Sequence, residues 1–302
     1  MNRKVAIIND LKHNNRMSYL SIASIVSAFG DRAYTGVEDD ERYDAFISGY
    51  IEDSNKILEY REKIADKKLD SNNILYLCDP VFADNGERYA GISDSHIENY
   101  KKLMEISDII TPNFTEALYL TNLSYEENVK KYNIISYNNE SKDKADDLSK
   151  KIIESLFPLL DKIRFKKNQI TIITGIELYD AILTILDVYD GDHCKRQTTC
   201  NYSMKVDSKD GVGDVFDAMF FEVSTNGFTL VDALSASTSF INNALRYCKD
   251  KRIDPKVGIF FEPILVDNIN VIRKRLNERV NNAKNNASNI NAKQNSSDIE
   301  GV

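Results

Sequence analysis

The segment Ile74-Leu75-Tyr76-Leu77-Cys78, which stops at Asp79-Pro80, is typical of a short buried strand. Apolar residues then recur at helical spacing from His96 to Ser107, and Ile109-Ile110 predicts another short strand that stops at Thr111-Pro112. A strand, a helix and a second strand in this order favour parallel pairing, because the helix carries the chain back to the starting end of the sheet.

The same alternation of short apolar runs and amphipathic segments extends along most of the chain. Further strands are predicted over 5–8, 45–47, 170–174, 181–188 and 195–206, and further helices over 18–29, 115–120, 148–163, 215–225 and 229–248. We therefore predict one α/β domain over 1–275, with a mostly parallel central sheet flanked by helices.

Two polar segments interrupt this pattern. From Asn281 to Val302, seven of the 22 residues are asparagine and none is aromatic. Such a segment buries too little apolar area to offset the entropy lost on ordering, so 276–302 is predicted to be a disordered tail. The segment from Ser124 to Asp147 is rich in Asn, Lys and Glu and is predicted to be a mobile surface excursion.

The composition excludes several classes of protein. The 302 residues carry a formal net charge of −8, which argues against a nucleic-acid partner. No apolar run approaches the ~20 residues of a membrane span, and the N-terminus lacks the apolar stretch of a signal peptide. Four cysteines do not make a disulfide framework. We expect a cytoplasmic protein that acts on a small molecule.

The sequence Gly211-Val212-Gly213-Asp214 stands directly before an apolar helix. Its two glycines let the backbone approach a ligand closely, and a helix N-terminus suits phosphate oxygens. A carboxylate beside such an anion site could accept the proton of an attacking hydroxyl. Taken alone, the motif is better explained as a glycine-rich turn in which the aspartate caps the helix, because Gly-x-Gly-Asp is short and common.

Three further polar clusters follow predicted strands. Asp79 stands at a strand end, where a carboxylate can hold Mg²⁺ through water, and the turn sequence Asp84-Asn85-Gly86 and Tyr89 come after it. Asn113 and Glu116 begin a helix, either as ligands of one metal-phosphate group or simply as a capping box. Thr174-Gly175 ends the next strand. Ligands collect at the carboxyl ends of parallel strands, so the clusters together predict a site for phosphate and Mg²⁺.

These motifs resemble those of the pyridoxal kinases in the ribokinase-like superfamily. The resemblance is carried by 79–86 with Tyr89, by 108–117, by 172–175 and by 211–216, within a region from about Val5 to Glu262. It implies a ribokinase-like kinase domain that uses ATP and Mg²⁺ to phosphorylate the hydroxymethyl group of pyridoxal, pyridoxine or pyridoxamine. It also implies a homodimer, and a monovalent cation as a possible further cofactor.

The resemblance assigns roles to single residues. Asp214 would be the catalytic base, and Gly211 and Gly213 would form the anion hole over the transferred phosphoryl group. The other implied roles are ATP contacts for Asn113, Glu116 and Thr174, metal binding for Asp79 and Glu116, positions near the phosphates for Asp84 and Tyr89, and substrate binding for Asp10.

The chain departs from the family pattern in places. Only Asp31 to Arg42 separate the first helix from the next apolar run, where the family has a second strand and a flap over the vitamin ring, so we expect a shortened or lost flap. Asp217 replaces a small residue, and its charge would weaken ATP binding. Two alternatives therefore stay open: a hydroxymethylpyrimidine kinase, and a degenerate, non-catalytic protein that binds a nucleotide or vitamer.

Overall fold

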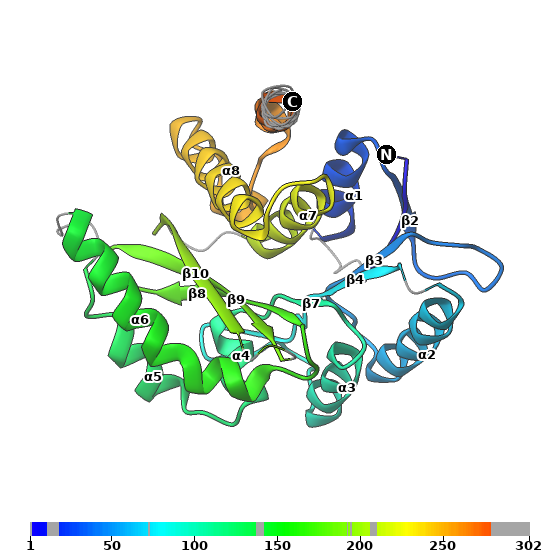
Figure 1. Ribbon diagram of the computed structural model, residues 1–302, viewed down its shortest axis with the longest axis horizontal. Coiled ribbons are helices and arrows are strands. Elements are labelled where there is room, and N and C mark those ends of the chain that lie inside the picture. Colours follow the sequence, from blue (N-terminus) through cyan, green and yellow to red (C-terminus); the bar gives the residue numbers. More distant parts are fainter. Residues whose placement is uncertain are drawn as a thin grey trace, which may run out of the picture.

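The central feature of the structure, a computed structural model, is an eight-stranded sheet with the order β10-β9-β8-β7-β4-β3-β1-β2 (Figure 1). The structure describes residues 2–10, 18–71, 73–136, 142–191, 193, 195–205 and 210–278. The strands are β1 (Lys4–Ile8), β2 (Arg32–Thr35), β3 (Ala45–Ser48), β4 (Leu75–Cys78), β7 (Ile109–Ile110), β8 (Ile170–Glu177), β9 (Ala181–Asp190) and β10 (Lys195–Met204). Neighbouring strands from β2 to β8 pair in parallel, whereas β9 and β10 extend the sheet in antiparallel fashion.

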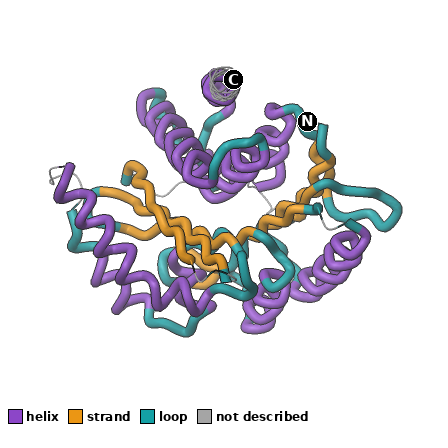
Figure 2. The backbone as a smooth tube through the Cα atoms, viewed as in Figure 1, coloured by secondary structure: helices purple, strands orange, loops and turns teal. Residues whose placement is uncertain are grey.

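Helices cover both faces of this sheet, so that the strands form the middle layer of three (Figure 2). One face carries α1 (Ser18–Phe29), α7 (Val212–Thr225), α8 (Leu230–Asp250) and a last helix over 262–278. The other carries α2 (Ser54–Asp70), α3 (Asp94–Met104), α4 (Phe114–Leu120), α5 (Tyr125–Tyr132) and α6 (Lys142–Ile163). A small hairpin of β5 (Ala83–Asp84) and β6 (Glu87–Arg88) stands apart, and the short 3₁₀ helix η1 spans Pro255–Val257. This arrangement is the predicted α/β class.

The sheet separates two hydrophobic cores. Successive side chains along a strand point to opposite faces of the sheet, so each strand contributes residues to both cores. In β1, Val5 and Ile7 join the core under α1, α7 and α8, while Ala6 and Ile8 join the core on the opposite face. In β8, Ile172 and Ile173 divide in the same way. Strands buried on both faces need apolar residues throughout, which is why they appear in the sequence as short continuous apolar runs.

Most predicted elements are confirmed, with informative exceptions. Helix α2 was not predicted, because only Ile57 and Ile64 are fully buried on it and its apolar stripe is narrow. The prediction of a mobile excursion from Ser124 to Asp147 is wrong for Tyr125–Tyr132, which forms α5 and buries Tyr132 edge-on against Phe114. It is also wrong for 142–147, which belong to α6.

The second strand implied by the family resemblance is present as β2, paired with β1, and residues 36–44, which contain no strand, connect it to β3. Of the predicted tail, 276–278 continue the last helix, and 279–302 lie outside the described residues. Within the described ranges, no helix has both the length and the apolar character required to span a membrane.

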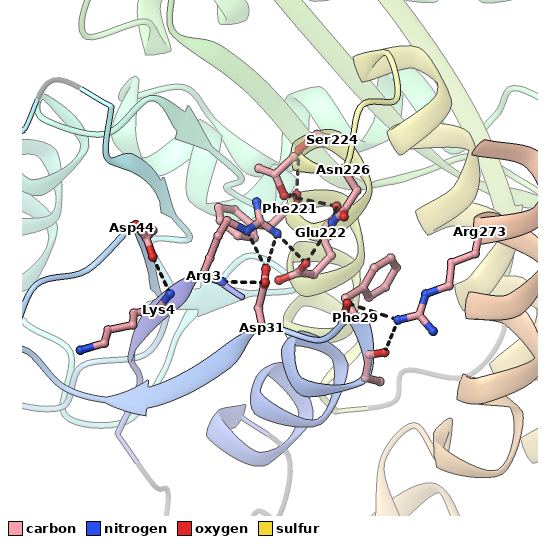
Figure 3. Close-up of polar contacts among 12 residues, drawn as sticks. Arg3, Lys4, Phe29, Asp31, Asp44, Phe221, Glu222, Ser224, Asn226 and Arg273 are labelled. Carbon is pink, nitrogen blue, oxygen red and sulfur yellow. Dashed lines mark hydrogen bonds and ion pairs between the residues drawn. The ribbon is translucent and has the colours of Figure 1, made fainter. Parts of the chain in front are cut away.

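A buried ionic cluster joins the start of β1 to the last turn of α7 (Figure 3). The Arg3 guanidinium donates to Asp31 over 2.6 Å and to Glu222 over 2.9 Å, so one cation serves two carboxyl groups. The Glu222 side chain is fully buried, and this burial raises its pKa to about 8 despite the nearby Arg3 charge. Glu222 therefore holds its proton more tightly in the folded chain than in the unfolded one.

This shift predicts how the free energy of unfolding depends on pH. A carboxyl whose pKa is higher in the folded state stabilises the fold at low pH, and that contribution is lost as the pH rises from about 4.5 to about 8. We expect Glu222→Gln to remove this loss. Its unfolding free energy, measured relative to the parent by urea denaturation, should increase with pH by up to about 1.4 kcal/mol per pH unit. Other titrating groups are common to both proteins and cancel in the difference, so parallel pH profiles would contradict the assignment.

Candidate active site

All of the predicted site residues except Asp10 line one cavity of about 340 Å³ at the carboxyl ends of the parallel strands. Its wall comes from the segments after β4, β7 and β8, from the β5–β6 hairpin and from the start of α7. The residues predicted from the sequence that line it are Asp79, Asp84, Tyr89, Asn113, Glu116, Thr174, Gly211, Gly213 and Asp214. The topology thus brings together polar groups from four separate stretches of the chain. They lie at the carboxyl ends of the parallel strands, where α/β sheets bind ligands.

The N-terminus of α7 is the part of the wall best suited to an anion. Gly211 is its N-cap, with a left-handed φ of 81° that an L-residue adopts only under strain, and it has no side chain with which to cap the helix. Asp214 therefore lies in the first turn, and the alternative in which it caps the helix is excluded. A Cβ added to Gly213 would lie 3.7 Å from Asp79 Oδ2, which shows how closely the helix start approaches the end of β4. The first N–H groups of a helix have no partner within the helix, and together with the helix dipole they favour negative charge at such a point.

Asp214 is held by Asn9, a residue after the first predicted strand to which the sequence assigned no role. Asn9 Nδ2 donates to Asp214 Oδ1 over 3.1 Å, and Asn9 Oδ1 accepts from the Tyr50 N–H over 3.1 Å. Asn9 directly follows β1, just as Asp79 follows β4, so its position at a strand end was the available signal. These contacts orient the carboxylate that faces the anion site.

Asp10 lies elsewhere. Its carboxylate accepts from the Glu52 N–H over 2.9 Å and lines a separate open depression together with Asp53, Lys56 and His96. The structure therefore does not bring Asp10 into the cavity that holds the other predicted residues. Its contact with a substrate ring stays a prediction.

Asn113 and Glu116 form the capping box that was one of the two interpretations of their spacing. Glu116 Oε2 accepts from the Asn113 N–H over 2.8 Å, and Asn113 Oδ1 accepts from the Glu116 N–H over 3.0 Å. Glu116 is buried, and its Oε1 also accepts from the N–H of Phe82 over 2.9 Å. The pair thereby ties the loop after β4 to the start of α4 while both residues still line the cavity.

The cavity is strongly acidic. Seven carboxyl-bearing residues line it and, among the residues that the structure describes there, no lysine, arginine or histidine does; the seven are Asp79, Asp84, Glu116, Glu177, Asp210, Asp214 and Asp217. Burial, together with the charge of Asp214, raises the pKa of Asp79 to about 8. Burial and the neighbouring Asp79 likewise raise the pKa of Asp217 well above its ordinary value. Outside the lining residues, Lys205 pairs with one of these carboxylates, Glu177, over 3.2 Å.

Comparison with known proteins identifies the family. The model of the phosphomethylpyrimidine kinase family matches residues 5–259. The chain belongs to this kinase family. Pyridoxal kinase from Ovis aries is 34% identical over 83 residues, which are 26% of this chain and 27% of that protein, so the aligned part spans about a quarter of the relative. The resemblance to pyridoxal kinases is confirmed.

Two solved structures share the ribokinase-like fold. A putative phosphomethylpyrimidine kinase from Bacteroides thetaiotaomicron, crystallised with pyridoxal, superposes with a TM-score of 0.69 at 22% identity, covering 89% of this chain and 96% of that one. The PdxK of Plasmodium falciparum, with the ligands AMP-PNP and PL, gives a TM-score of 0.65 at 19% identity, covering 90% and 96%. At these identities the likeness establishes the fold.

The family implies a divalent cation, and the oxygen-rich wall fits one that arrives with its ligand. Mg²⁺ is usually held by one or two carboxylates together with substrate phosphates, not by a complete protein cage. In the described part of the chain, no group of three or more His, Cys, Asp or Glu side chains is arranged to hold a metal by itself. Asp79 lies next to the helix N-terminus, and its part in holding such a cation stays a prediction.

The β5–β6 hairpin, which carries Asp84, is fixed by its neighbours. Asn85 and Gly86 both have positive φ, 51° and 82°, as a tight hairpin turn requires. The Gly86 N–H donates to Thr115 Oγ1 over 3.1 Å, and a Cβ at Gly86 would come within 2.5 Å of the Tyr125 ring. Only glycine suits both this backbone and the ring that covers it.

Gly86→Ala and Gly91→Ala separate these two requirements. Gly91 has a similar φ of 86°, but a Cβ there would meet nothing within 4 Å. We expect Gly91→Ala to lower the unfolding free energy by about 1 kcal/mol through backbone strain alone, and Gly86→Ala to lower it by a further ~1–3 kcal/mol through the clash with Tyr125. Urea denaturation of both variants measures the difference. Equal losses would mean that the ring does not confine the turn.

Proposed function

We propose that the protein is an ATP-dependent kinase that phosphorylates the hydroxymethyl group of a B6 vitamer to give its 5′-phosphate. The proposal is carried by the placement of Asp214, which lies in the first turn of α7 behind a glycine N-cap and is held by Asn9. Membership of a kinase family, a pyridoxal kinase relative and similar folds crystallised with pyridoxal, or with AMP-PNP and PL, support it.

The geometry suggests how the residues would act. The substrate hydroxyl would pass its proton to Asp214 while its oxygen forms a bond to the γ-phosphorus, and the bond from that phosphorus to the ADP oxygen breaks. Asn9 would keep the Asp214 carboxylate directed at the hydroxyl. N–H groups at the start of α7 would stabilise the charge on the transferred phosphoryl group, in the region of Gly211 and Gly213.

The other predicted roles concern the nucleotide. Asp79 would hold Mg²⁺, which when bound neutralises phosphate oxygens. Both carboxylate oxygens of Glu116 accept backbone N–H groups, so its part in metal binding would be through water or by positioning the loop after β4. Thr174 and Asn113 would contact ATP, and Asp84 and Tyr89 would lie near its phosphates, since all four line the cavity.

A hydroxymethylpyrimidine kinase is the second candidate. It is favoured by the family match itself, which is to phosphomethylpyrimidine kinases. Both candidates transfer a phosphoryl group to a hydroxymethyl group on an aromatic ring, so the same base and anion site would serve either. Residues that would contact the ring of the substrate, and not those at the start of α7, would decide between a pyridine and a pyrimidine.

We expect Asp214→Asn to lower kcat about 100- to 10,000-fold, because the amide cannot accept the hydroxyl proton. ADP release would be measured with ATP and Mg²⁺, with pyridoxal, pyridoxine, pyridoxamine and hydroxymethylpyrimidine supplied separately. Asp267→Asn, an exposed change on the last helix, serves as the matched control and should retain parental kcat.

The outcomes separate the candidates. Turnover of a vitamer that Asp214→Asn abolishes would support the proposal, and undiminished turnover in this variant would refute the assigned base. Turnover of the pyrimidine alone would favour the second candidate. ATP binding without turnover of any substrate would indicate a non-catalytic binding protein.

A further inference from the structure

The chain after β3, from Gly49 to Glu52, contains no helix or strand, yet all four of its peptide N–H groups donate to other parts of the protein. The first of them, that of Gly49, donates to the carbonyl oxygen of Ile8 over 3.0 Å. Buried peptide groups outside regular structure need such partners. Side chains supply the other three acceptors: Asn9 Oδ1 for Tyr50 over 3.1 Å, the Tyr100 hydroxyl for Ile51 over 3.0 Å, and Asp10 Oδ2 for Glu52 over 2.9 Å.

The Tyr50 N–H decides which way the Asn9 amide points. A peptide N–H can only donate, so the Asn9 atom that faces it is the oxygen, Oδ1. The amide nitrogen is then directed at Asp214, whose Oδ1 it reaches over 3.1 Å. Asn9 also packs so closely on Gly49 that a Cβ added there would lie 2.8 Å from Asn9 Nδ2. The orientation of the group that holds the proposed base thus depends on one short piece of backbone.

Tyr100 and Asp10 hold the peptide groups on either side of Tyr50. Tyr100, on α3, is fully buried, and its hydroxyl donates to the Gly49 carbonyl over 2.9 Å while it accepts from the Ile51 N–H. Asp10 binds the segment twice, because its own N–H donates to the Tyr50 carbonyl over 2.7 Å. Loss of either side chain would leave peptide groups without partners, and the segment would have to rearrange to pair them.

The same segment forms part of the candidate active site. Tyr50 and Asp214 both belong to the described wall of the cavity, and Tyr100 and Asp10 do not. These two residues can therefore affect the site through the backbone without touching a ligand in it. Small displacements matter here, since a reacting group misplaced by about 1 Å can lower a rate about 100-fold.

We propose that Tyr100 and Asp10 are positioning residues for the proposed base: they fix the peptide groups that flank Tyr50, so that its N–H orients Asn9 and Asn9 directs the Asp214 carboxylate. Asp10 acts by accepting a backbone N–H, in place of the substrate contact that the family resemblance implies. This role needs an acceptor oxygen at position 10 but no charge, and it needs a hydroxyl at position 100. The inference rests on the proposed function, because that function makes Asp214 the base.

Steady-state kinetics of three variants test the inference. The measured quantities are kcat and KM with pyridoxal, or with hydroxymethylpyrimidine if the parent phosphorylates only that ring, and the Kd of ATP with Mg²⁺ by calorimetry. We expect Tyr100→Phe and Asp10→Ala to lower kcat at least about tenfold, because the base is displaced, and to change KM and Kd less than about threefold. Asp10→Asn, whose amide oxygen can still accept the Glu52 N–H, should keep kcat within about threefold of the parent.

Tyr132→Phe is the matched control. Tyr132 is also a buried tyrosine on a helix of the same face of the sheet, and its hydroxyl shares a 3.1 Å hydrogen bond with Ser155 Oγ. Neither residue belongs to the described wall of the cavity, so this variant should retain parental kcat. Urea denaturation would show that each variant is folded under the conditions of the assay.

Each result decides the inference. Parental kcat in folded Tyr100→Phe, or an equal loss of kcat in Tyr132→Phe, would overturn it. A KM that rises in both Asp10 variants would also overturn it, because that result indicates a substrate contact. If Tyr100→Phe does not fold, the Asp10 variants decide: kcat lost with alanine and restored with asparagine supports the inference, and any other result overturns it.

Failure of this inference and failure of the proposed function are distinguishable. If the parent turns over substrate while these variants retain parental kcat, only the positioning role fails. If the parent turns over neither ring, the proposed function fails, and with it the base that Tyr100 and Asp10 position.

Discussion

Two polar contacts fasten α7 against β1, and the position of the candidate active site depends on them. Asn9 at the end of β1 donates to Asp214 in the first turn of the helix, and Arg3 at the start of the strand donates to Glu222 two turns further on. The helix therefore runs antiparallel to the strand and is held at both ends. Any change in its tilt would move the N–H groups at its start away from the ends of the parallel strands.

The carboxyl groups at the two ends of this strand–helix pair are compensated in different ways. At the Arg3 end, a guanidinium lies between two buried carboxyl groups, Asp31 and Glu222, and charge is balanced within the protein. At the Asn9 end, the partner of the carboxylate is a neutral amide, and the remaining charge faces the cavity. The first end stabilises the fold, and the second keeps a carboxylate available for chemistry.

The acidic cavity has a cost in stability that the rest of the molecule offsets. Asp79, Glu116 and Asp217 are all buried at the carboxyl end of the sheet, where burial opposes their ionisation. Two hydrophobic cores, one on each face of the sheet, provide the stabilising free energy, and only a few residues of each reach the cavity. Buried, imperfectly compensated charge at one edge of an otherwise apolar interior is typical of a functional site.

The amino-acid sequence by itself determined the α/β class, helices such as α1 and α8, and the four polar clusters, because periodicity and strand-end punctuation are local signals. It missed α2, whose buried face is reduced to Ile57 and Ile64. Tertiary structure alone decided that Asn9, and not Asp10, reaches Asp214, and that Asp79 meets Asp217. Asn9 and Asp214 are 205 residues apart, and which of two adjacent side chains reaches Asp214 depends on how the strand ends and turns against a helix from the far end of the chain. No local pattern encodes such a contact, because it exists only after the sheet has formed and both helix layers have packed on it.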